Sequence, residues 1–241
     1  MNILENLIAS LDTQSPVYDI RQGIFHTAVV TRHCGLAATL PKDAMRQKPP
    51  LMRRPGTLLD LSALELARLA MSDRILEAAV GMAAINSLLD VDEEMCIELN
   101  AAELIIEKGA GKRVAIVGHF PFVPRVKEKA AQLWVIEKNP TADDLDEHAA
   151  SEVIPRADVV AVTGTALTNH TLEGLLTLCR PDSFVVMLGD TVPITPLLFE
   201  LGVDALSGTR VADTEAVLRC VSQGANFRQI KGIRKLTMIK R

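Results

Sequence analysis

The sequence predicts an α/β protein, in which a small α+β domain at the N-terminus is followed by a larger domain built on a parallel sheet. From about Ala101 onward, short apolar runs typical of buried strands alternate with helix-like segments, and this alternation is the pattern of βαβ units. The first hundred residues show strands first and helices afterwards, which is typical of α+β domains. A boundary near Asp90–Met95 predicts domains over residues 1–94 and 95–241.

The first strands are predicted from two strand-like runs around a glycine. Val17–Gln22 and Phe25–Thr31 flank Gly23, and so short a separation indicates a hairpin. The next stretch, Pro41–Pro55, is basic and rich in proline, so we expect a loop there.

Two helices are expected before the boundary. The first, Leu61–Met71, has Asp60 or Ser62 as its N-cap. The second, Arg74–Leu89, is apolar on all sides, and a helix of this kind is usually buried between layers.

The second half is expected to alternate strands with helices. Its strands are predicted at Arg113–Val117, Leu133–Ile136, Asp158–Val162, Phe184–Leu188, Ala205–Leu206 and Lys235–Ile239. Its helices are predicted at Asn100–Lys108, Pro124–Ala131, Thr171–Cys179, Pro196–Leu201 and Asp213–Ser222. Asn100 and Glu103 resemble a capping box that opens the first of these helices.

Composition excludes several classes of partner. With a formal net charge of -4 and 3% aromatic residues, the chain has neither the basic face nor the stacking side chains that nucleic-acid binding needs. No apolar run approaches the roughly 18 residues of a membrane span, and the first residues lack the basic start of a signal peptide. The cysteines are far apart and are expected to be reduced and packed: Cys34, Cys96, Cys179 and Cys220. We therefore expect a cytoplasmic protein with no nucleic-acid or membrane partner.

Candidate site residues gather at the predicted strand ends. Because the carboxyl ends of parallel strands share one edge of a sheet, and ligands bind at this edge, we expect these residues to line a ligand site. They are Gly118, His119, Glu137, Thr163, Gly164, Thr165, Asn169, Gly189, Asp190 and Ser207. Turn geometry or helix capping explains any single one more simply, so the inference rests on the coincidence of five strand ends.

A dinucleotide site is disfavoured at the first strand end. The fingerprint needs several glycines after the strand, whereas Gly118 stands alone before His119-Phe120-Pro121. Glu137 lies 19 residues beyond Gly118, as a ribose-binding acid would, so an adenosyl or nucleotide cofactor that is bound differently stays open.

Metal binding has His119 and Asp190 as its candidate ligands, with Glu137 as a third if the fold brings them together. The sequence has no H-E-x-x-H helix, and an isolated histidine more often hydrogen-bonds locally than binds a metal.

Asn86 is the polar exception in the apolar helix at 74–89. A buried amide must find partners, so Asn86 either caps a neighbouring loop or projects into a cleft beside His119.

Four features together resemble a known family. They are VGHFPF (117–122), the acid Glu137, ADVVAVTGTALTNHT (157–171) and LFELGVDALSGTRVAD (198–213). In this combination the chain resembles a bacterial and archaeal family of uncharacterised proteins with a proposed role in heavy-metal chelation. The resemblance implies an enolase N-terminal-like domain, a Rossmann-like domain and a site in the cleft between them. The chain departs from the family pattern at Gly189-Asp190, where a Gly-Pro turn is usual.

The leading functional hypothesis is a small-ligand-binding protein. Its interdomain cleft would take an anionic metabolite or act in heavy-metal chelation, with a heavy-metal ion as the candidate cofactor. The alternative is a transferase-type enzyme with an adenosyl or nucleotide cofactor in the same cleft, and whether the chain is an enzyme stays open, with no catalytic residue assigned. A third interpretation is a structural protein in a homo-oligomer, which rests on the apolar helix at 74–89.

Overall fold

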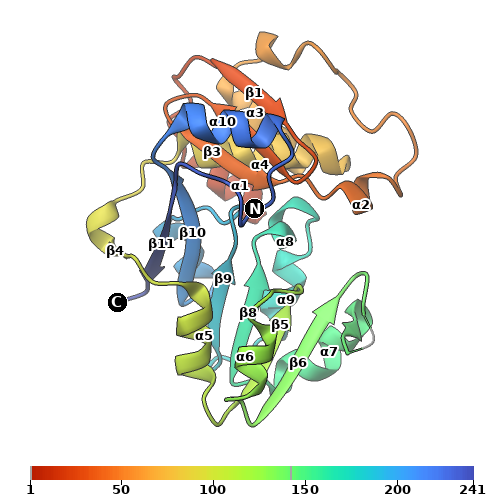
Figure 1. The fold of residues 1–241 in the computed structure, drawn as a ribbon, viewed down its shortest axis with the longest axis vertical. Coiled ribbons are helices and arrows are strands. Elements are labelled where there is room, and N and C mark those ends of the chain that lie inside the picture. Colours follow the sequence, from red (N-terminus) through yellow and green to blue (C-terminus); the bar gives the residue numbers. More distant parts are fainter. Residues whose placement is uncertain (1, 142) are drawn as a thin grey trace.

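The computed structural model describes residues 2–141 and 143–241, which form a mixed α/β fold with two sheets (Figure 1). The small sheet has three antiparallel strands in the order β1-β2-β3. The large sheet has eight strands in the order β4-β11-β10-β9-β8-β5-β6-β7 and is mostly parallel, with β11 antiparallel to both of its neighbours. The predicted fold class is therefore confirmed.

The small sheet consists of β1 (Asp19–Gln22), β2 (His26–Val30) and β3 (Cys34–Ala38). The first two form the predicted hairpin. The third was not predicted, because its sequence, CGLAA, consists mainly of small residues and shows no alternation. A Cβ at Gly35 would overlap the backbone of helix α4 (Ile75–Leu88) at Ala83, so glycine lets this strand lie directly on that helix.

The N-terminal helices are α1 (Ile3–Ala9), α2 (Pro41–Ala44), α3 (Ala63–Arg68) and α4 (Ile75–Leu88). Helix α4 packs against β2 and β3 and is buried on nearly all sides, as its apolar sequence predicts. Its apolar surface is thus covered within the chain. Ser62 caps α3 with a full capping box. Helix α2 lies in the stretch expected to be a loop, since its single turn is too short for a periodic signal.

The second half contains the rest of the large sheet and its helices. Its strands are β4 (Cys96–Ile97), β5 (Arg113–Val117), β6 (Gln132–Glu137), β7 (Leu145–Asp146), β8 (Val159–Thr163), β9 (Phe184–Leu188), β10 (Ala205–Val211) and β11 (Ile233–Ile239). Its helices are α5 (Ala101–Gly109), α6 (Val123–Lys127), α7 (Ala150–Val153), α8 (Thr165–Thr168), α9 (Leu172–Leu178) and α10 (Thr214–Ser222). Strands β5 and β9 have the predicted limits.

Strand β10 and the start of α5 differ in detail from their predictions. Strand β10 does not end at Leu206 but continues to Val211, because it pairs with β11 along seven residues. Ser207 therefore lies inside a strand and not at its end. Asn100 caps α5 as expected, but Glu103 binds Arg125 through its side chain and does not complete a capping box.

Helices cover both faces of the large sheet. Alternate residues of β5 point to opposite faces, so Val114 and Ile116 pack in the layer that includes α5 and α6. Ala115 faces the larger core, which also includes Ile85 of α4 and Leu4 of α1. Both halves of the chain therefore contribute to one core. Among the described helices, none is long and apolar enough to cross a membrane.

Helix α10 joins the second half of the chain to the small sheet. Figure 1 shows it lying across this sheet, on the side opposite to α4. Its residues Val217, Leu218 and Val221 pack in one apolar cluster with Ala28 and Leu36 of the sheet. The small sheet is therefore enclosed by an N-terminal helix on one face and a C-terminal helix on the other.

Candidate functional site

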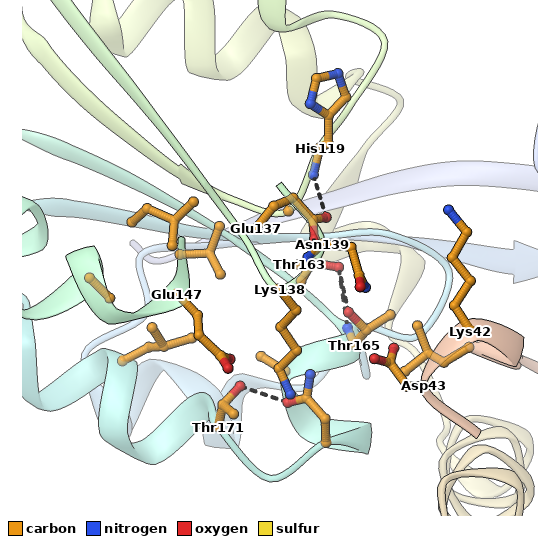
Figure 2. A pocket seen from close by; sticks show the side chains of 18 of the residues that line it. Lys42, Asp43, His119, Glu137, Lys138, Asn139, Glu147, Thr163, Thr165 and Thr171 are labelled. Atoms are coloured by element: carbon orange, nitrogen blue, oxygen red, sulfur yellow. Dashed lines mark hydrogen bonds between the residues drawn. The ribbon is translucent and has the colours of Figure 1, made fainter. Parts of the chain in front are cut away.

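A cavity of about 810 Å³ lies at the carboxyl ends of β5, β6 and β8. Ligands of open α/β sheets bind at this edge. The sheet side contributes residues directly after these strands and from the turn between α8 and α9. The opposite wall comes from the N-terminal half, at Phe25 and residues 40–43. Figure 2 shows two residues of this wall, Lys42 and Asp43. The cavity is thus lined by both halves of the chain.

Glu137 holds the ends of β5 and β6 together. One of its carboxylate oxygens accepts the backbone N–H of His119 at 3.0 Å, and the other accepts that of Asn139 at 3.4 Å. Gly118 has a φ of +104°, and its N–H donates to the carbonyl of Ile136 at 2.9 Å. This left-handed conformation turns the chain out of β5 and brings the His119 N–H to the carboxylate.

His119 is oriented by a buried acid that the sequence did not single out. Its Nδ1 lies 3.0 Å from an oxygen of Asp144, whose side chain is 1% exposed while that of His119 is 48% exposed. Asp144 also accepts hydrogen bonds from the N–H and the hydroxyl of Thr141, at 2.9 and 2.7 Å. Burial alone would raise the pKa of Asp144, but the hydrogen bonds from Thr141 and His119 outweigh it and lower this pKa. Asp144 therefore accepts the Nδ1–H of His119 as a carboxylate.

Hydroxyl and amide groups line the middle of the cavity. The hydroxyls of Thr163 and Thr165 lie 3.0 Å apart, on either side of the tight turn between β8 and α8. The Thr171 hydroxyl donates to the side-chain oxygen of Asn169 at 2.6 Å. Because its oxygen is engaged, Asn169 is oriented to present its NH₂ group as a donor.

The cavity also contains charged side chains of both signs. Lys138 follows β6 and Asp43 belongs to α2, and both are half-buried. Among the described residues, neither has an oppositely charged group within the 4.0 Å of an ion pair. Lys42 and Glu147 add an exposed charge of each sign. Figure 2 shows Asp43 extending from α2 toward Thr165, and Lys138 extending from β6 toward Thr171.

Six of the predicted site residues line this cavity: Gly118, His119, Glu137, Thr163, Thr165 and Asn169. The sequence did not single out Lys42, Asp43, Lys138, Asp144 or Glu147. A threonine three residues before Asp144 was the available signal, since this spacing is typical of a side chain that caps a local turn.

Asp190 lies elsewhere, which separates the two residues expected to share a metal. One of its oxygens lies 2.6 Å from Nε2 of the buried His26, whereas His119 pairs with Asp144. Burial would lower the pKa of His26, but the hydrogen bond and charge of Asp190 raise it above its ordinary value. His119, Glu137 and Asp190 therefore do not converge on one ion site.

The remaining predicted residues also lie outside the cavity lining. Gly164 packs closely against Val192, and Gly189 turns the chain with a φ of +115°. Ser207 is buried and accepts a hydrogen bond from Thr237 at 2.9 Å. The Asn86 side chain donates to the carbonyls of Leu36 at 2.8 Å and Thr191 at 3.3 Å. Of its two interpretations, the structure shows the one in which Asn86 caps neighbouring chain segments.

The donor set does not fit a heavy-metal ion held by the protein alone. In the described part of the chain, no group of three or more His, Cys, Asp or Glu side chains is placed to hold an ion. No cysteine is among the described residues that line the cavity, although thiolates are the preferred ligands of soft metals. Burial raises the pKa of Cys34 to about 12 and that of Cys179 to about 11, so both are protonated thiols at neutral pH.

Two family models match the chain, one in each half. A family model, DUF364, matches residues 100–240, and a second, DUF4213, matches residues 4–89. The chain belongs to the DUF364 family. Both models carry the description "Putative heavy-metal chelation", so the family resemblance read from the sequence is confirmed.

Two solved structures from the DUF364 family, both described as having unknown function, are similar to this chain. The one from Desulfitobacterium hafniense has a TM-score of 0.87 and 26% identity, covering 99% of this chain and 98% of its own. The one from Pyrococcus horikoshii has a TM-score of 0.83 and 25% identity, with the same coverage. An uncharacterized protein of Methanocaldococcus jannaschii is 27% identical over 180 residues, which are 71% of this chain and 69% of that protein. These two structures and the chain share the family's fold.

Proposed function

We propose that the chain binds a small anionic metabolite in the cavity between α2 and the carboxyl ends of β5, β6 and β8. Small-molecule sites have volumes of about 300–1,000 Å³ and combine apolar walls with a few placed polar groups. The cavity, at about 810 Å³, has this size and composition. Its apolar walls include Leu175 and Phe25, and its polar groups come from three neighbouring strand ends.

The observation that carries the proposal is Lys138, a half-buried lysine in the lining with no carboxylate of the described residues in ion-pair range. An ammonium group that no protein carboxylate pairs with is free to form a charge-assisted hydrogen bond to an anion of a ligand. A carboxylate or phosphate of a ligand would supply that anion. The Thr163 and Thr165 hydroxyls and the Asn169 amide supply neutral donors for the rest of an anionic group.

This proposal is compatible with the family description. Carboxylates are common metal-binding groups of small chelators and are also the groups that Lys138 would recognise. The proposal therefore places the anionic groups on the ligand and the cations on the protein.

The test compares two lysine variants with the wild type. Lys138→Met removes the charge from the cavity, whereas Lys127→Met makes the same change on an exposed part of α6 outside the lining. We expect citrate or diglycolate to raise the melting temperature of the wild type and to bind measurably in isothermal titration. Loss of one charge-assisted contact should weaken binding to the Lys138 variant by about tenfold or more.

The control variant should bind as the wild type does. Equal affinity of both variants, or a wild type that neither anion stabilises, would contradict the proposal. Melting temperatures without ligand show whether each variant is folded.

A further inference from the structure

A half-buried charge of each sign lies among the described residues that line the cavity, on opposite walls. Lys138 lies on the sheet side, after β6, and Asp43 lies on the N-terminal side, in α2. Both are half-buried, and neither forms an ion pair with a described residue. A purely anionic ligand would satisfy Lys138 but would meet repulsion from Asp43. A ligand with an ammonium group and a carboxylate would satisfy both.

A bare metal cation fits this cavity poorly. Lys42 and Lys138 repel it, and two of the acids that line the cavity already accept hydrogen bonds from the protein. Glu137 accepts two backbone N–H groups, and Asp144 accepts two groups of Thr141 as well as His119. The protonated thiols of Cys34 and Cys179 lie outside the lining.

We propose that the ligand is a metal-free zwitterionic aminocarboxylate, whose ammonium group binds Asp43 and whose carboxylate binds Lys138. This inference rests on the proposed binding of an anionic metabolite and names its chemical class. Aminocarboxylates are chelators, because their nitrogen and oxygen atoms bind metals together once the nitrogen loses its proton. The chelating groups thus belong to the ligand, which accounts for a family linked to heavy-metal chelation whose cavity has no metal-binding cluster among the described residues.

Two probes of matched shape isolate the ammonium group. Iminodiacetate has a protonated amine between two carboxylates at neutral pH, and diglycolate has an ether oxygen in its place. By isothermal titration we expect the wild type to bind iminodiacetate about tenfold more tightly than diglycolate, the effect of one charge-assisted hydrogen bond. Asp43→Asn should bring this ratio close to one without weakening the binding of diglycolate.

Asp60→Asn is the matched control, because Asp60 is an exposed aspartate that also belongs to the N-terminal half of the chain but lies outside the cavity lining. This variant should keep the wild-type ratio. If Asp43→Asn does not fold, the ratio in the wild type still decides the question. A wild type that binds diglycolate as tightly as iminodiacetate would overturn the inference and leave the proposed function standing. If neither iminodiacetate nor diglycolate binds, the inference and the proposed function are both contradicted.

Titrations with Ni²⁺ test the proposed metal-free state of the ligand independently. Ni²⁺ alone should not bind the wild type, and one equivalent of Ni²⁺ added to iminodiacetate should weaken its binding, since the metal takes the nitrogen and displaces its proton. Tight binding of Ni²⁺ without a chelator, lost in His119→Ala, would show a protein-held metal and overturn the inference.

Discussion

Gly118 sets the backbone path at the centre of the site. Its φ of +104° lies in the left-handed region, and a Cβ there would approach the Phe120 ring to 3.1 Å and the Thr163 side chain to 3.2 Å. The residue thus combines an unusual conformation with close packing. Both features keep the ends of β5 and β8 together and place His119 against Glu137.

We expect Gly118→Ala to lower the free energy of unfolding by about 1–3 kcal/mol, because alanine is strained in this conformation. Gly174→Ala is the control. Gly174 lies within α9 with open space around it, so alanine there should raise stability by roughly 0.4–1 kcal/mol. Urea unfolding followed by Trp134 fluorescence measures both changes, and effects of the same sign would contradict this account.

At the scale of elements, α10 decides how the small sheet is completed. Helix α4 covers one face of this sheet, and α10, from near the end of the chain, covers the other. An isolated three-stranded sheet is marginal unless its apolar faces are packed. The N-terminal elements therefore depend on a helix that is more than a hundred residues away in sequence.

Leu218→Ala tests this dependence, since Leu218 packs between α10 and the sheet with 8% of its surface exposed. We expect a loss of about 2–5 kcal/mol, the usual cost of such a truncation in a core. Leu59→Ala, at a leucine that is 57% exposed, should change stability little. Tyr18 reports on the small sheet and Trp134 on the large one, and their urea transitions should shift together. Separate transitions would contradict a shared structural unit.

At the scale of the whole molecule, a buried ion pair connects the two sheets. His26 belongs to β2, and Asp190 follows β9, and their closest atoms are 2.6 Å apart. The other ring nitrogen of His26 lies 3.2 Å from the carbonyl of Ala225. Asp190 raises the pKa of His26 in spite of the burial that opposes this, so the folded chain retains this proton to a higher pH than the unfolded chain does.

This pair predicts how stability depends on pH. Because the pKa of His26 is raised by folding, its contribution is fully present below the unfolded pKa, about 6.5, and is lost as pH rises through the folded pKa. We expect the free energy of unfolding of the wild type to fall over this range and that of His26→Gln to fall less. Urea titrations between pH 5.5 and 9 measure the difference, and parallel curves for the two proteins would contradict the assignment.

The sequence by itself determined the strands and the helix that are buried on all sides, because their apolar residues form continuous runs. Strands β5 and β9 are buried on both faces, so their apolar runs begin and end where the strands do. Helix α4 is apolar on all sides because sheet and helices surround it. The edge of the sheet was predictable for the same reason, since Gly118, Glu137 and Thr163 stand where the apolar runs of β5, β6 and β8 stop.

Only the tertiary structure decided which polar residues meet at that edge. Asp144, which follows β6, lies beside His119, which follows β5, and Asp43 lines the cavity because the small sheet is held against the large one. Ser207 lies outside the cavity lining because pairing with β11 extends its strand. Asp190 lies outside the lining because it pairs with His26. Burial patterns are local and repeat along the chain, whereas these contacts depend on how separate segments pack, which no local pattern records.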